Sequence, residues 1–186
     1  MLLTITRHGQ THQNKAGILQ GHVEGTLNEE GILQAKKLAQ RLQQQSFCHI
    51  YCSDLQRAMH TAQSIALYHK QTPITHTPML RERYLGEFEG KHKTEVGWDV
   101  FPNNNEPLLG ESIPALRQRM QTFLQDILHT HQHALVVCHS GSAKMLIELL
   151  LQRPIQKLDN TSVSQFNIHP NNHIDIIHLN CIQHLQ

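Results

Sequence analysis

The chain begins, after Met1, with Leu2-Leu3-Thr4-Ile5-Thr6-Arg7-His8-Gly9. The first five of these residues are apolar or β-branched and predict a buried strand over residues 2–6. Arg7 and His8 follow directly, at the carboxyl end of that strand, where open α/β sheets bind their ligands. The tripeptide alone does not establish a function, because the chain has 16 histidines and Arg-His pairs also occur on ordinary surfaces.

Strands and helices alternate along the rest of the chain. Asn28 predicts a helix N-cap, and the apolar face of that helix is predicted to comprise Ile32, Ala35, Leu38, Ala39 and Leu42. Further strands are predicted at residues 48–52, 74–77, 134–138, 163–168 and 174–179. Further helices are predicted from Ser53 or Asp54 as N-cap to about residue 68, from Ser112 onward, and over 140–151. This order predicts an α/β fold, a three-layer α/β/α sandwich with a mostly parallel mixed sheet, in which the C-terminal hairpin supplies an antiparallel strand.

The length and composition limit the class of protein. A chain of 186 residues with 39% hydrophobic residues is expected to form one domain over residues 1–186. Lys and Arg number 16 against 15 for Asp and Glu, so the net charge of +1 offers no general attraction for nucleic acid or an anionic membrane. Since no apolar run suits a signal peptide or a membrane span, we expect a cytoplasmic protein. The oligomeric state is not predicted.

Neither the cysteines nor a cluster of three histidines is expected to bind a metal ion. Cys48, Cys52, Cys138 and Cys181 are scattered and are expected to be small core residues in a reducing compartment, with metal or redox binding by Cys48 and Cys52 as the alternative. The alternating His129, His131 and His133 lie at the end of a predicted helix, where cationic side chains suit the helix dipole. Metal binding is the alternative there too.

Strand ends bring related side chains to one edge of the predicted sheet. Arg7 and His8 follow the first strand, and His139 follows the strand over residues 134–138. Arg57 lies in the first turn of the helix after strand 48–52, beside N–H groups that favour an anion. Guanidinium groups bind phosphoryl oxygens in bidentate geometry, so the convergence of these residues predicts a phosphoryl site.

A proton donor for such a site is Glu82, in Leu80-Arg81-Glu82-Arg83. A carboxyl group near a phosphate dianion tends to stay protonated and can then give its proton to a leaving oxygen. The alternative is that Glu82 forms a surface ion pair with Arg81 or Arg83.

The ordered motifs of the chain resemble those of a known family. In chain order they are Arg7-His8-Gly9-Gln10-Thr11 with Asn14 and Gln20-Gly21, Ser53-Asp54-Leu55-Gln56-Arg57-Ala58, Leu80-Arg81-Glu82, Gly86-Glu87-Phe88-Glu89-Gly90, Gly110-Glu111-Ser112 and His139-Ser140-Gly141. Together they resemble the histidine phosphatase superfamily, the phosphoglycerate mutase-like family, over essentially the whole chain.

The resemblance implies a covalent mechanism in which His8 attacks phosphorus and water then hydrolyses the phosphohistidine. Arg7, Arg57 and His139 would hold the phosphoryl oxygens, and Glu82 would act as general acid and then as base. Further contacts to the phosphoryl group or substrate are expected from Asn14, Gln20, Gly21 and Ser140. No metal or other cofactor is implied. His8 must be neutral to attack, so a backbone carbonyl is expected to accept from its other ring nitrogen.

Departures from the mutase pattern favour hydrolysis. Mutases usually carry Tyr three residues after the acid, where this chain has Leu85, and a pair of adjacent arginines that is missing between Lys91 and Ser112. The block from Leu85 to Gly90 looks more like the small broad-specificity phosphatases and the α-ribazole phosphatases. We therefore expect a metal-independent phosphomonoesterase acting on a small phosphorylated metabolite.

Two alternatives remain at this point: a cofactor-dependent phosphoglycerate mutase, and a catalytically inactive phosphate-binding or protein-interaction module. The natural substrate is not predicted, because selectivity is expected from the 84–111 loop, a long segment rich in Gly, Pro and Asn. Trp98 and Phe101 in this loop are expected either to line the substrate site or to anchor the loop.

Overall fold

The computed structural model describes residues 1–97, 110–128, 132–171 and 173–186. In these residues one sheet of six strands has the order β3-β2-β4-β1-β5-β6. The strands are β1 (Leu2–Arg7), β2 (His49–Ser53), β3 (Ile74–Thr77), β4 (His133–Cys138), β5 (Val163–Ile168) and β6 (Ile174–Cys181). The predictions about Trp98, Phe101, His129 and His131 fall outside the described residues.

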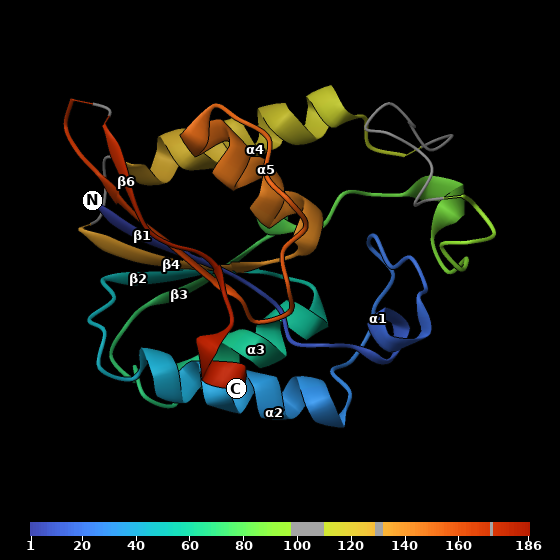
Figure 1. Cartoon of the computed structure of the whole chain (residues 1–186), viewed down its shortest axis with the longest axis horizontal. Helices are drawn as coiled ribbons and strands as arrows, with labels where there is room; N and C mark the ends of the chain where they lie inside the picture. The colour runs from blue at the N-terminus through green and yellow to red at the C-terminus, as the bar shows by residue number, and fades with distance from the viewer. Residues whose placement is uncertain (98–109, 129–131, 172) are drawn as a thin grey trace.

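Helices cover both faces of the sheet, which confirms the predicted three-layer sandwich (Figure 1). One face is covered by α4 (Ile113–Leu128) and α5 (Ser140–Leu151), and the other by α2 (Glu29–Leu42) and α3 (Gln56–Ala66). The short elements are α1 (His12–Ala16) and the 3₁₀ helices η1 (Pro78–Leu80), η2 (Gly86–Phe88) and η3 (Gln183–Leu185). Among the described helices, none is long and apolar enough to cross a membrane.

The sheet is mixed and mostly parallel, as predicted. β1 pairs with β4, and β2 with both β4 and β3, in parallel, whereas β5 lies antiparallel to β1 and β6 antiparallel to β5. The parallel strands end at one common edge, so the residues that follow β1, β2 and β4 meet there.

The central strands are apolar on both sides because each face of the sheet has its own core. Along β4, Val136 and Cys138 belong to the cluster under α4 and α5, while Leu135 and Val137 belong to the cluster with α2 and α3. All four side chains have no exposed surface. Because β4 is buried on both faces, as is usual for a parallel strand, its residues 134–138 form a continuous apolar run.

Asn28 caps α2 as predicted, because its Oδ1 accepts from the N–H of Gly31 at 2.8 Å. The prediction that Ile32 belongs to the buried face is wrong, since its side chain is 46% exposed. Gly31 takes the inward place in the first turn, where a Cβ would collide with the backbone oxygen of Gln10. The close approach of α2 to the strand end therefore turns Ile32 outward.

Two further expectations need correction. Neither Ser53 nor Asp54 caps α3, whose N-cap is Leu55 without a side-chain hydrogen bond. Asp54 instead forms an ion pair with Arg81 at 2.6 Å. All four cysteines are free, and Cys52 and Cys138 are buried as expected. Cys48 is exposed and Cys181 is partly exposed, so the core interpretation is wrong for Cys48 and holds only in part for Cys181.

The N-cap residue of α2, Asn28, also joins this helix to the segment that follows β1. The Nδ2 of Asn28 donates to Gln10 Oε1 at 2.8 Å and to the Thr11 carbonyl at 3.4 Å. We predict that Asn28→Ala lowers the free energy of unfolding by about 1–2 kcal/mol, measured by urea unfolding, and that Asn28→Asp, which keeps the acceptor, loses less. Ser112→Ala, which removes only a cap at α4, is the control. A smaller loss for Asn28→Ala than for this control would contradict the double role.

Candidate active site

His8 and His139 lie side by side at the carboxyl edge of the sheet. Arg7 is in register with Cys138, and the N–H of His8 donates to the Cys138 carbonyl at 3.0 Å, so the two histidines follow paired positions. Their ring centroids are 5.1 Å apart with an interplanar angle of 60°. The predicted meeting of the two imidazoles is present in the structure.

The ring of His8 is held in one tautomer. Its Nδ1 lies 2.7 Å from the carbonyl oxygen of Gly9, which can only accept, so Nδ1 carries the proton and Nε2 keeps its lone pair. Burial, then the charges of Arg57 and Arg7, lower the pKa of His8 well below 6.5. The imidazole is therefore neutral and presents a nucleophilic Nε2 near neutral pH.

Arg57 is 1% exposed and connects three parts of the site. Its Nε donates to Nδ1 of His139 at 3.2 Å, Nη1 to the Val23 carbonyl at 3.0 Å and Nη2 to the Gly21 carbonyl at 2.7 Å. A guanidinium has five N–H donors, so these bonds leave two for another acceptor. Burial lowers the pKa of Arg57 below its usual value.

Arg7 is buried at the end of β1, directly before His8 in the chain, with 7% of its surface exposed. Its Nη1 donates to the Leu158 carbonyl at 2.7 Å, and its own carbonyl accepts from the N–H of Thr161 at 3.0 Å. Among the described residues, the buried Nε of Arg7 has no hydrogen-bond partner. Burial lowers the pKa of Arg7 to about 10. The site thus contains a buried cationic donor with unused capacity.

His139 has protein partners at both ring nitrogens. Because Arg57 only donates, Nδ1 of His139 is the acceptor, and Nε2 must then carry the proton that it shares with Ser53 Oγ at 2.8 Å. Burial, followed by the charge of Arg57, lowers the pKa of His139 well below 6.5. This ring is neutral and fixes the direction of the Arg57 guanidinium.

Glu82 reaches the same edge from the segment after η1. Its carboxylate accepts from the N–H groups of Gly141 at 3.0 Å and Ser142 at 3.2 Å, in the first turn of α5, and from that of Arg83 at 2.9 Å. A Cβ at Gly141 would collide with Oε1 of Glu82, so glycine is required for this approach. Arg81, one of the surface partners considered for Glu82, pairs with Asp54 instead.

The four residues predicted to bind the phosphoryl group or substrate are Asn14, Gln20, Gly21 and Ser140. Gly21 supplies its carbonyl to Arg57, and Gln20 accepts from Thr11 Oγ1 at 3.2 Å. Asn14 completes the capping box of the short helix α1, whose N-cap is Thr11, because its Oδ1 accepts from the N–H of Thr11 at 3.2 Å. Ser140 is half-buried in the first turn of α5.

Three further residues support the site without having been assigned a role in it from the sequence. Asn160 donates through Nδ2 to the His8 carbonyl at 2.8 Å and to Asn14 Oδ1 at 3.3 Å. His22 donates through Nε2 to the Glu82 carbonyl at 2.8 Å. Glu89 accepts at Oε1 from the N–H of His22 at 2.7 Å. From the sequence, His22 is expected near the rim of the pocket, and Glu89 lies in the Gly86–Gly90 motif, so of these three residues Asn160 is the one without a sequence signal.

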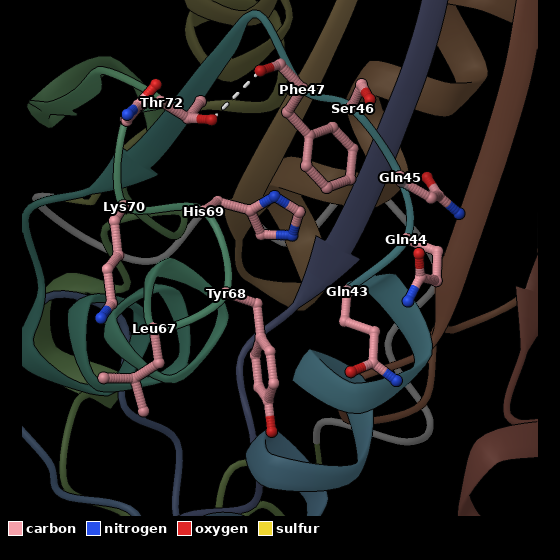
Figure 2. A pocket seen from close by; sticks show the side chains of 11 residues that line it. Gln43, Gln44, Gln45, Ser46, Phe47, Leu67, Tyr68, His69, Lys70 and Thr72 are labelled. Carbon is pink, nitrogen blue, oxygen red and sulfur yellow. Dashed lines mark hydrogen bonds between the residues drawn. The ribbon is translucent and has the colours of Figure 1, made fainter.

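A separate hollow of about 590 Å³ lies at the opposite edge of the sheet (Figure 2). It is lined by residues 43–47, which precede β2, and by residues 67–72, which follow α3. Figure 2 shows the ring of His69 beside Phe47, with their centroids 5.1 Å apart. None of the predicted site residues lines it. In the described part of the chain, no group of three or more His, Cys, Asp or Glu residues is arranged to hold a metal ion.

A comparison of the sequence with models of protein families agrees with the order and geometry of these residues. The model of the histidine phosphatase superfamily (branch 1) matches residues 3–181. The chain belongs to the histidine phosphatase superfamily. It is 34% identical over 176 residues to an adenosylcobalamin/α-ribazole phosphatase of Salmonella typhimurium, covering 89% of this chain and 87% of that protein.

Other members of the histidine phosphatase superfamily are similar over almost the whole chain. A metal-independent phosphoserine phosphatase of Arabidopsis thaliana is 31% identical, covering 99% of this chain and 85% of that protein. The crystal structure of the α-ribazole phosphatase from Shigella flexneri superposes with a TM-score of 0.86 at 29% identity, covering 97% of this chain and 96% of that one. The chain is a phosphatase of this superfamily, whose typical mechanism proceeds without metal through a phosphohistidine.

The buried neutral His8 of this phosphatase makes its stability depend on pH. The unfolded chain binds a proton at His8 below about pH 6.5, whereas the folded chain does so only at much lower pH, so acidification favours unfolding. We predict that the free energy of unfolding falls less in His8→Gln than in the wild type between about pH 7 and about pH 5, measured by urea unfolding. Equal losses in the two proteins would contradict a neutral buried imidazole.

Proposed function

We propose that the enzyme hydrolyses phosphomonoesters of small metabolites with His8 as nucleophile. The observation that supports this most directly is the bond from His8 Nδ1 to the Gly9 carbonyl, which leaves Nε2 unprotonated in a site where the charges of the buried Arg57 and Arg7 act on the ring. A nucleophile that is neutral beside fixed cations can attack a phosphorus whose oxygens those cations bind.

In the first half of the proposed reaction, Nε2 of His8 forms a bond to phosphorus while the ester P–O bond breaks. Glu82 gives a proton to the leaving oxygen, which departs as an alcohol. In the second half, Glu82 takes a proton from water, whose oxygen attacks phosphorus while the P–N bond breaks. Inorganic phosphate is released, and His8 and Glu82 return to their starting protonation states.

Arg7 and Arg57 are proposed to bind the phosphoryl oxygens, supported by the unpartnered Nε of Arg7 and the two donors that Arg57 retains. His139 is proposed to orient the guanidinium of Arg57. Its Nε2–H, which is hydrogen-bonded to Ser53 Oγ in this structure, is proposed to donate to a phosphoryl oxygen when substrate is bound. Additional contacts to the phosphoryl group or substrate are proposed for Asn14, Gln20, Gly21 and Ser140.

The substrate is proposed to be a small phosphorylated molecule, of the kind named for the relatives that act on α-ribazole phosphate and phosphoserine. Leu85, at the position of the mutase tyrosine, is 5% exposed and apolar, so it offers no polar contact to a phosphoglycerate. Hydrolysis is therefore favoured over transfer of the phosphoryl group to another phosphoglycerate.

Two broader features belong to the same proposal. Residues 1–186 are proposed to form a single histidine phosphatase domain, supported by the match over residues 3–181 and by one sheet that includes both ends of the match. The cytoplasm is the proposed location, supported by four free cysteines, two of which are buried.

The nucleophile is tested by trapping the covalent intermediate. We predict that His8→Asn abolishes phosphate release from p-nitrophenyl phosphate and the acid-labile, alkali-stable label left on the protein after mixing with a ³²P-labelled substrate. His12→Asn, at an exposed position on α1, is the control and should retain both signals.

A label that survives in His8→Asn would overturn the assignment. Efficient isomerisation of 3-phosphoglycerate in the presence of 2,3-bisphosphoglycerate, with little free phosphate, would show a mutase instead. Binding of phosphate without label or turnover in the wild type would show an inactive module.

The proton donor is tested by leaving-group dependence. We predict that Glu82→Gln slows hydrolysis of glycerol 2-phosphate about 100-fold, because an alkoxide leaves poorly without a proton, but slows p-nitrophenyl phosphate much less. Glu87→Gln, at an exposed neighbouring position, should hydrolyse both substrates as the wild type does. Equal losses for both substrates in Glu82→Gln would exclude Glu82 as the acid.

A further inference from the structure

Arg119 of α4 uses its whole guanidinium to hold the segment that contains Glu82 and the carboxylate of Glu111. Nη1 donates to the carbonyls of Met79 at 2.6 Å and Arg81 at 2.9 Å, and Nη2 donates to the Glu82 carbonyl at 3.4 Å. Nε and Nη2 also donate to the two carboxylate oxygens of Glu111, at 2.8 Å and 2.6 Å. An arginine has five N–H donors, and these five bonds account for all of them.

The backbone around Glu82 needs such a donor. Residues 81–85 follow η1 and belong to neither a helix nor a strand, so their carbonyls have no regular ladder partners. Carbonyls away from water require hydrogen-bond donors, and a side chain from a packed helix can supply them. The side chain of Arg119 is only 19% exposed, which keeps this set of bonds away from solvent.

Glu111 links the same segment to the far end of the 84–111 loop. Its N–H donates to the Tyr84 carbonyl at 2.9 Å, and its own carbonyl accepts from Arg83 Nε at 2.7 Å. Its carboxylate, 16% exposed, receives the bidentate bond from Arg119. Hydrogen bonds therefore join Arg83 and Tyr84, at the start of the loop, to Glu111 at its end, next to Glu82 in the chain.

We propose that Arg119 and Glu111 form a positioning pair that keeps the Glu82 carboxyl on the first turn of α5, within reach of a leaving oxygen. The inference rests on the proposed role of Glu82 as proton donor. Neither residue of the pair touches the phosphoryl group. The planar fork binds three carbonyls and a carboxylate together, which a lysine ammonium with three donors cannot reproduce.

The test compares leaving groups in Arg119→Lys. The variant is expected to hydrolyse glycerol 2-phosphate at least about tenfold more slowly than the wild type, because proton transfer is impaired, while p-nitrophenyl phosphate changes less than about threefold. Arg117→Lys, an exposed position on the same helix, is the matched control and should leave both rates unchanged. Glu111→Gln, which loses one of the bidentate contacts, is expected to show a weaker form of the same pattern.

A double mutant separates positioning from general stability. In a Glu82→Gln background, Arg119→Lys should cause no further selective loss toward glycerol 2-phosphate, since the group that it positions is gone. Equal losses for both substrates in Arg119→Lys, or an additive selective loss in the double mutant, would overturn the inference. If Arg119→Lys does not fold, as judged by thermal unfolding, Glu111→Gln is judged by the same criteria.

The same measurements distinguish this inference from the proposed function. Selective loss in Glu82→Gln with none in Arg119→Lys leaves the function standing and refutes the positioning pair. Absence of selective loss in Glu82→Gln refutes the assigned acid, and the inference fails with it.

Discussion

The parallel pairing of β1 with β4 is the constraint on which the site depends. The bond from the His8 N–H to the Cys138 carbonyl continues this ladder to the end of both strands and places His8 beside His139. His139 in turn directs Arg57, and the helix that begins after His139 supplies the N–H groups that receive the Glu82 carboxylate. A register shift of one residue would turn these strand-end side chains to opposite faces of the sheet and separate the groups.

The buried groups of the site are poorly balanced in charge by the protein alone. Arg7 and Arg57 are almost fully buried, and burial lowers the pKa of both, as it does for the two neutral imidazoles. Burying cations without full compensation costs stability, and an anion held by their unused donors would recover part of that cost. If these groups bind a phosphoryl group as proposed, the arrangement sacrifices stability of the free protein for complementarity to that group.

Much of this structure was predictable because it follows from local patterns. The apolar runs of β1 and β4, the Asn28 cap and the start of α5 at Ser140 are encoded within a few residues. The pairing of His8 with His139 then followed from parallel topology. Ile32 was mispredicted because periodicity does not show that Gly31 packs on another backbone, and Asn160 was missed because its contact with His8 spans 152 residues and has no local signature.

The contacts of Arg7 and His8 with residues 158–161 have a consequence for synthesis of the chain. β1 and His8 are synthesised before the groups that hold the end of this strand. The carbonyl of Leu158, the side-chain amide of Asn160 and the backbone N–H of Thr161 are made more than a hundred residues later. Contacts of such long sequence separation form late and slow the folding of a domain. The nascent chain therefore contains His8 during the synthesis of more than a hundred residues without the buried surroundings that lower the pKa of its imidazole.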